Sequence, residues 1–101
     1  MRKIEEAMCA AVKERRNWQS GNTRVEVKDG GNWVKVYLWD NLIYTECRED
    51  NDAKRFTLAG WNTNTTRSRL NALGVGVTQL NFFPYYNGHE INSSAWYKIN
   101  N

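Results

Sequence analysis

Residues 33–39, WVKVYLW, form the strongest strand pattern in the sequence. Their side chains alternate in character, as they do in a strand whose two faces meet different surroundings. One face would carry three aliphatic residues, Val34, Val36 and Leu38. The other face would carry three aromatic rings and one amine, from Trp33, Lys35, Tyr37 and Trp39. The pattern predicts a central strand with a buried aliphatic face and an aromatic face that is either covered by a helix or open.

Weaker strand patterns flank this segment on both sides. Val25 and Val27 alternate with polar residues from Thr23 onward, and Asp29-Gly30-Gly31 follows as a turn sequence. After residue 39, Asp40-Asn41 can form a two-residue turn, because both residue types tolerate a positive φ angle. Three further segments are expected next: a strand over 42–47, a polar loop over 49–53 and a short strand over 55–59.

The N-terminal segment, residues 3–16, has the periodicity of a helix. Apolar residues recur at helical spacing along it: Ile4, Ala7, Met8, Ala11 and Val12. Acidic residues lie in its first turn and basic residues in its last turn, an order that complements the helix dipole. We expect this helix to pack on the sheet through its apolar stripe; the alternative is a helix that binds a partner.

The C-terminal half contains a second helix signal. Residues 62–66 are all Asn or Thr, types that cap helix N-termini, and Gly74 would end a short helix over 67–73. Three features are expected after it: a strand over 75–83 whose regular pairing is stopped by Pro84, a hairpin turn at Asn87-Gly88, and a last strand over 95–99.

These segments follow the order α-β-β-β-β-α-β-β. Because βαβ units with Gly-rich loops are absent from the sequence, we expect a mainly antiparallel sheet. A chain of 101 residues is long enough for one domain. The sequence therefore predicts a single α+β domain over residues 1–101, with a sheet of about five or six strands on which both helices pack.

The charges are unevenly distributed, although the net charge is only +3. Residues 54–69 contain four cations and no acid, whereas residues 40–52 contain five acids and one cation, Arg48. A surface with a basic and an acidic face suits a protein partner at least as well as DNA, because phosphate binding needs clustered positive charge. The apolar runs are too short for a membrane span, so no membrane partner is expected.

Cysteine usage points to a reducing compartment. Cys9 and Cys47 are far apart in the sequence and form no CxxC motif. Glu5 and Glu6 occupy the place where a signal peptide would need apolar residues. We therefore expect two reduced thiols in a cytosolic protein.

The sequence offers little for catalysis. It contains one histidine, His89, which follows the Asn87-Gly88 turn, and no phosphate-binding glycine motif. One histidine and two scattered cysteines do not complete a structural zinc site. We therefore expect a non-enzymatic protein without a catalytic residue, metal or cofactor.

The aromatic residues are the best candidates for binding. The expected partner-binding set consists of Trp33, Lys35, Tyr37, Trp39 and Trp61. If these rings are exposed, they suit a protein interface, where Trp, Tyr and Arg dominate the binding energy. Exposed rings beside Lys would also suit single-stranded nucleic acid, because every base can stack on them. The third possibility is that the rings fill the core of a small domain.

A second candidate site is basic. The Asn and Thr residues ahead of the second helix would present free backbone N–H groups, which can hold a phosphate. The expected phosphate or partner contacts are Lys54, Arg55, Arg67 and Arg69. The alternative is simple capping beside solvated arginines, and Arg67 and Arg69 do not share one helix face.

Three blocks of the sequence resemble those of small proteins from tailed bacteriophages. Residues 17–25, NWQSGNTRV, resemble the pattern NWxxGNTxV, and residues 60–73, GWNTNTTRSRLNAL, resemble GWxTxTTKSRLNAL. Residues 76–86, GVTQLNFFPYY, resemble GVxVxQxxFxWY. The chain departs from these patterns at Arg67, where they have Lys, and at Pro84, which precedes Tyr85. The resemblance carries no catalytic residue.

The resemblance implies a protein that acts by binding in the host cytoplasm. The predicted function is to bind a host protein or complex and inhibit a defence system, such as restriction or CRISPR, or a nucleic-acid machine. An acidic loop, Glu49 to Asp52, could mimic phosphate charge toward such a partner. One alternative is a small nucleic-acid-binding module. Another is a virion or assembly component that self-associates through a sheet edge.

Overall fold

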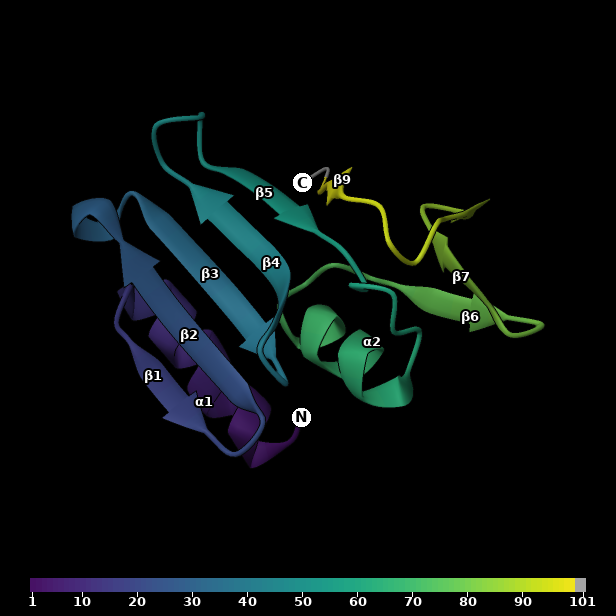
Figure 1. Cartoon of the computed structure of the whole chain (residues 1–101), viewed down its shortest axis with the longest axis horizontal. Coiled ribbons are helices and arrows are strands. Elements are labelled where there is room, and N and C mark those ends of the chain that lie inside the picture. Colours follow the sequence, from purple (N-terminus) through teal and green to yellow (C-terminus); the bar gives the residue numbers. More distant parts are fainter. Residues whose placement is uncertain (100–101) are drawn as a thin grey trace.

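The computed structural model describes residues 1–99 of the chain. Over that range the protein is α+β, with a six-stranded sheet, a three-stranded sheet and two α-helices (Figure 1). The predicted fold class is confirmed. In chain order the elements are α1 (Lys3–Glu14), β1 (Trp18–Ser20), β2 (Thr23–Lys28), the 3-10 turn η1 (Asp29–Gly31), β3 (Trp33–Leu38), β4 (Asn41–Cys47), β5 (Ala53–Phe56), α2 (Asn64–Ala72), β6 (Thr78–Leu80), β7 (Phe83–Tyr86), β8 (His89–Glu90) and β9 (Tyr97–Lys98).

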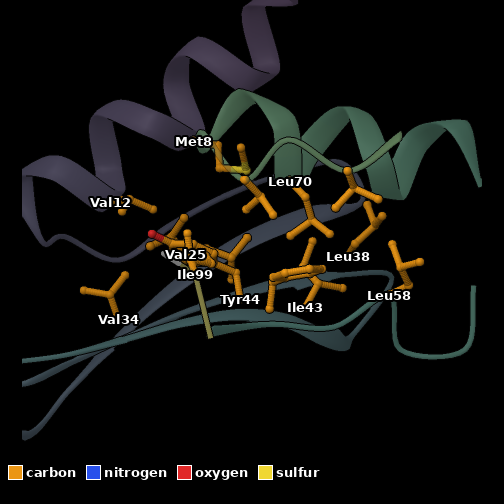
Figure 2. Packing of buried hydrophobic residues seen from close by; sticks show 14 of the residues in the cluster. Met8, Val12, Val25, Val34, Leu38, Ile43, Tyr44, Leu58, Leu70 and Ile99 are labelled. Atoms are coloured by element: carbon orange, nitrogen blue, oxygen red, sulfur yellow. The ribbon is translucent and has the colours of Figure 1, made fainter. Parts of the chain in front are cut away.

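The larger sheet is antiparallel throughout, in the order β1-β2-β3-β4-β5-β9. Its first five strands follow one another along the chain, so each joins its neighbour by a short connection. β9 then pairs with β5 from the end of the described chain. Both helices lie on the same side of this sheet, with the apolar side chains between the two layers (Figure 2).

The core forms where the apolar stripe of α1 meets the aliphatic face of the sheet. Val34, Val36 and Leu38 are buried, as the alternation of residues 33–39 predicts. Met8 from α1 and Leu70 from α2 are fully buried against them (Figure 2). Burying a side chain of this size stabilises the fold by about 1.5–3 kcal/mol. The core therefore fixes which face of the sheet is left for other contacts.

The turn between β3 and β4 lies one residue earlier than the sequence predicts. Leu38 pairs with Asn41, so the turn residues are Trp39 and Asp40 rather than Asp40 and Asn41. Both turn residues have positive φ angles, 48° and 62°. A two-residue turn of this kind matches the twist of the strands, but it requires the left-handed conformation at both positions. Trp39 therefore leaves the strand and lies at the tip of the hairpin.

The predicted strand over 75–83 is also wrong. β6 stops at Leu80, a turn at Asn81 and Phe82 follows, and β7 then pairs back on β6. Pro84 lies inside β7, where its carbonyl accepts a hydrogen bond of 3.0 Å from the Ile91 N–H. The turn at Asn87-Gly88 is confirmed and leads into β8. These three strands form a separate small sheet instead of extending the large one.

Other differences concern short segments. The sequence predicts no strand between residues 16 and 23, where β1 pairs with β2. The strand predicted over 55–59 begins two residues and ends three residues later than β5. The second helix begins at Asn64, earlier than expected, and Thr63 caps it by accepting a 3.1 Å hydrogen bond from the Thr66 N–H. Neither helix in residues 1–99 is long and apolar enough to cross a membrane.

Candidate binding surface

The face of the large sheet that lies opposite the helices carries the predicted aromatic residues of β3. We call it the open face, because no element crosses in front of β2 and β3 in Figure 1. Trp33, Lys35 and Tyr37 are half-buried there. The Arg24 guanidinium carbon lies 4.2 Å from the Tyr37 ring centre, and the Lys35 amine lies 5.6 Å from that of Trp33. The rings are therefore partly covered by cations.

Strand register aligns further cations across the open face. Lys35 lies opposite Thr45, Thr45 opposite Arg55, and Arg55 opposite Lys98. Several of the surrounding cations are paired with acids at the surface. Arg24 contacts Asp40 at 3.0 Å, Lys28 contacts Glu26 at 3.2 Å, and Arg55 contacts Asp50 at 3.0 Å. Much of the positive charge on this face is thus compensated.

The large exposed apolar residues lie mostly elsewhere. Five of them occur in three segments of the C-terminal half, and we call this set the apolar lobe: Trp61, Leu80, Phe82, Phe83 and Trp96. Phe82 is 88% exposed and Trp61 is 58% exposed. In Figure 1 the small sheet that carries three of these residues lies at the end of the molecule farthest from β1. Trp39, 56% exposed at the β3–β4 turn, is outside the lobe.

Polar contacts hold the three segments of the apolar lobe together. The Asn62 side-chain amide donates to the Phe82 carbonyl at 3.2 Å and to the Gln79 side chain at 3.3 Å. Arg67 in turn donates to the side-chain carbonyl of Asn62. The Gly60 N–H donates to the Ser93 carbonyl at 2.9 Å, three residues before Trp96. Trp61 therefore lies between two anchored connections, one to the β6–β7 turn and one to the 93–96 segment.

The predicted phosphate contacts do not form one patch. Arg69 is only 4% exposed and forms an ion pair of 2.8 Å with Glu5, so it is not available to a ligand. Arg67 is occupied by Asn62 and by Asn64. Lys54 and Arg55 are neighbours in β5, and neighbours in a strand point to opposite faces of the sheet. This part of the prediction is corrected: the four side chains diverge.

Arg69 instead belongs to a buried polar cluster that joins α1, α2 and β2. Its guanidinium also donates to the Thr23 hydroxyl at 3.0 Å, while the Ser68 hydroxyl donates to Glu5 at 2.5 Å. Burial alone would raise the pKa of Glu5, but the hydrogen bonds from Ser68 and Arg69 outweigh it. The pKa of the carboxyl therefore lies below its ordinary value of 4.5. Glu5 is thus charged at neutral pH and fully paired.

The reactive residue types are dispersed. Within residues 1–99, no group of three or more His, Cys, Asp or Glu side chains could hold a metal ion. His89 lies exposed at the start of β8. Cys9 and Cys47 are unpaired, and burial raises the pKa of the Cys9 thiol, which donates to the Ala72 carbonyl at 3.2 Å.

Sequence reasoning found only one member of the apolar lobe, Trp61. It placed Leu80, Phe82 and Phe83 inside or at the end of a continuous strand, where alternate side chains would be buried. The signal that could have separated them is Asn81, since Asn adopts the left-handed conformation more readily than most residues. A turn at this point exposes the aromatic residue that follows.

One of the three comparisons with known proteins gives a match. A family model described as Kyanoviridae Gp96 protein matches residues 1–101. No curated protein and no solved structure shows significant similarity to the chain.

Proposed function

Because the chain belongs to the Kyanoviridae Gp96 protein family, and is thus a bacteriophage protein, we propose that it acts by binding a host protein. The apolar lobe is the proposed contact surface. Inhibition of this kind needs no catalytic residue, because this chain would act by covering a functional surface of its target. The target in this proposal is a host defence complex or a machine that handles nucleic acid.

The observation that carries this proposal is that Phe82 is exposed and has a positive φ angle. Its side chain is 88% exposed, so it adds almost nothing to the core. Its φ angle is +69°, a conformation that costs a bulky residue about 1–3 kcal/mol. A glycine would remove that cost, as Gly88 does at the equivalent position of the next turn. Phe82 is therefore poor for the stability of the isolated chain and suited to an external contact.

The chemistry around Phe82 indicates the kind of partner. The apolar lobe contains three further exposed aromatic residues and one leucine, and Trp is among the residues that contribute most to protein interfaces. The polar side chains close to Phe82 are mostly uncharged: Asn62, Gln79 and Asn81, with Arg67 bonded to Asn62. A largely apolar surface with few charges fits an apolar groove on a protein better than a nucleic acid backbone. Binding through this surface should therefore depend weakly on salt.

Affinity capture with matched variants tests the proposal. Tagged protein would be incubated with nuclease-treated host lysate, and retained proteins would be identified by mass spectrometry. Phe82→Asn removes the ring and keeps a residue that tolerates the turn. Trp39→Asn is the matched control, because it makes the same change at an exposed turn outside the apolar lobe. The proposal expects a host protein that Phe82→Asn loses and Trp39→Asn retains; the reverse pattern would place the contact at the β3–β4 turn.

Nucleic-acid binding is the second candidate, and the open face is the observation that favours it. Trp33 and Tyr37 lie there beside the aligned cations Lys35, Arg55 and Lys98. Rings for stacking with cations for phosphate suit a single strand. This candidate expects oligonucleotide binding that falls steeply with salt and weakens in Lys35→Gln. Affinity unchanged by that substitution would argue against the open face.

A further inference from the structure

A basic hollow lies at the C-terminal end of α1, far from the apolar lobe in the sequence. It has a volume of about 540 Å³ and is open to solvent on one side. Four cations line it: Lys13, Arg15, Arg16 and Arg48. The only acidic residue in its lining is Glu14, which pairs with Arg16 at 2.8 Å. The hollow therefore keeps a surplus of positive charge.

Three of these cations have an ordinary explanation, but the fourth does not. Lys13, Arg15 and Arg16 lie at the end of a helix, where positive side chains complement the helix dipole. Arg48 comes from the connection after β4, so its presence at the helix end is not explained by a preference for cations in the last turn of a helix. Among the residues that the structure describes, no hydrogen bond or ion pair engages its guanidinium. Arg48 lies beside the other cations at the helix end, and the repulsion between these positive charges is unfavourable unless an anion is bound.

Arg15 supplies the second observation. Its side chain is largely buried, and its Nη1 atom has no hydrogen-bond partner in the described chain. Its other terminal nitrogen lies 3.8 Å from a carboxylate oxygen of Glu46, beyond ordinary hydrogen-bond distance. A buried charged donor that lacks an acceptor is costly, so native structures generally satisfy such groups. Because this atom is closed off from solvent, a ligand in the hollow would satisfy it only after the Arg15 side chain turns outward.

Gly31 brings the two arginines together. A Cβ atom built on it would lie 3.8 Å from the Arg15 side chain and 3.9 Å from Arg48 Nη1. Both side chains thus pass the same point of the backbone. Gly30 and Gly31 have φ angles of 62° and 98°, and nothing lies within 4 Å of a Cβ placed on Gly30. Because Gly30 and Gly31 both line the hollow, the glycine turn leaves this part of it open.

We propose that the basic hollow binds a small phosphate-bearing anion, held by Arg15 and Arg48. Guanidinium groups present paired N–H donors that match the oxygens of phosphate. A doubly charged phosphate would neutralise the surplus charge and provide acceptors for both side chains. Carboxylates have the same fork geometry with half the charge, so they should bind more weakly. This site is independent of the proposed protein contact at the apolar lobe.

Titration followed by ¹H–¹⁵N NMR tests the proposal. Three probes would be added separately at low salt: inorganic phosphate, pyrophosphate and adenosine triphosphate. The expected result is saturable shifts of the Gly30, Gly31 and Arg48 amide signals, with dissociation constants below about 1 mM for at least one probe. Stronger binding of the triphosphate than of pyrophosphate would identify a nucleotide as the source. Equal binding would identify the phosphate groups alone.

Arg48→Gln is the decisive variant, because Arg48 is exposed and its loss should leave the fold intact. Loss of one charge-assisted contact should weaken binding by about tenfold or more. Arg55→Gln is the matched control, an arginine on the open face outside the hollow. The proposal is overturned if no probe saturates, if shifts spread over the open face, or if both variants weaken binding equally.

Discussion

At the scale of single residues, the chain keeps two aromatic side chains where local energetics favour small ones. Trp39 and Phe82 both occupy turn positions with positive φ, and both are exposed. Asn87-Gly88 shows the pair that such turns normally use. Sequence rules that look for Gly, Asn and Asp found the Asn87-Gly88 turn, placed the β3–β4 turn one residue too late and missed the β6–β7 turn. Both errors arise because a bulky residue occupies a turn position that normally excludes it.

Substituting Phe82 separates stability from binding. Phe82→Gly should raise the free energy of unfolding by about 1 kcal/mol, because glycine adopts the positive φ without strain. The same variant should lose the captured partner. Urea denaturation followed by tryptophan fluorescence measures the first effect, with Asn81→Gly as a control in the same turn. A loss of stability in Phe82→Gly would mean that the ring packs against the fold.

A second prediction at the residue scale concerns the stability contributed by the buried ion pair between Glu5 and Arg69. Both side chains are 4% exposed, so removing Arg69 leaves an uncompensated carboxylate in the interior. Arg69→Met should destabilise the protein by about 3–5 kcal/mol. The double variant Glu5→Gln with Arg69→Met should recover part of that loss, measured by thermal unfolding. Equal stability of wild type and Arg69→Met would show that the pair contributes no stability.

The same carboxyl predicts a dependence of stability on pH. The pKa of Glu5 is lower in the folded state than its ordinary value of 4.5. Its contribution to stability is therefore complete above that ordinary pKa and is lost as the pH falls toward the folded pKa. We expect Glu5→Gln to unfold with a shallower pH dependence below about pH 5 than wild type. Denaturation midpoints across that range check it, and parallel curves would contradict it.

At the scale of elements, long regular patterns were predictable and short ones were not. α1, β2, β3 and β4 each extend over at least six residues, so their apolar periodicity identifies both the element and its buried face. β1, β6 and β8 have two or three residues, too few for a period to be recognised. The buried role of Arg69 also escaped prediction, because only the packing of α2 against α1 brings Glu5 to it.

At the scale of elements, we predict that partner binding by the apolar lobe depends on Asn62. It links the segment around Trp61 to the β6–β7 turn through the Phe82 carbonyl. Asn62→Ala should weaken partner binding by about tenfold, because the two segments lose their fixed relative position. Asn64→Ala is the control, since it contacts the same Arg67 without touching β6 or β7. Equal binding by both variants would show that the linkage is unimportant.

At the scale of the whole molecule, three separate surfaces are candidates for binding: the open face, the apolar lobe and the basic hollow. The helices cover one face of the large sheet, and the opposite face carries rings and cations whose charges are largely paired. The basic hollow lies at the C-terminal end of α1, whereas the small sheet that carries three residues of the apolar lobe lies at the other end of the molecule (Figure 1). A protein and a small anion could therefore bind together. The sequence could not predict which of these surfaces is exposed, since exposure depends on the tertiary fold.

Site-specific photocrosslinking in infected host cells tests whether Phe82 contacts a host protein. A photoreactive phenylalanine analogue would replace Phe82 in one protein and Lys98, on the open face, in another. We expect position 82 to crosslink to one host protein and position 98 not to do so. Crosslinks to nucleic acid, or to a host protein from position 98 alone, would contradict it.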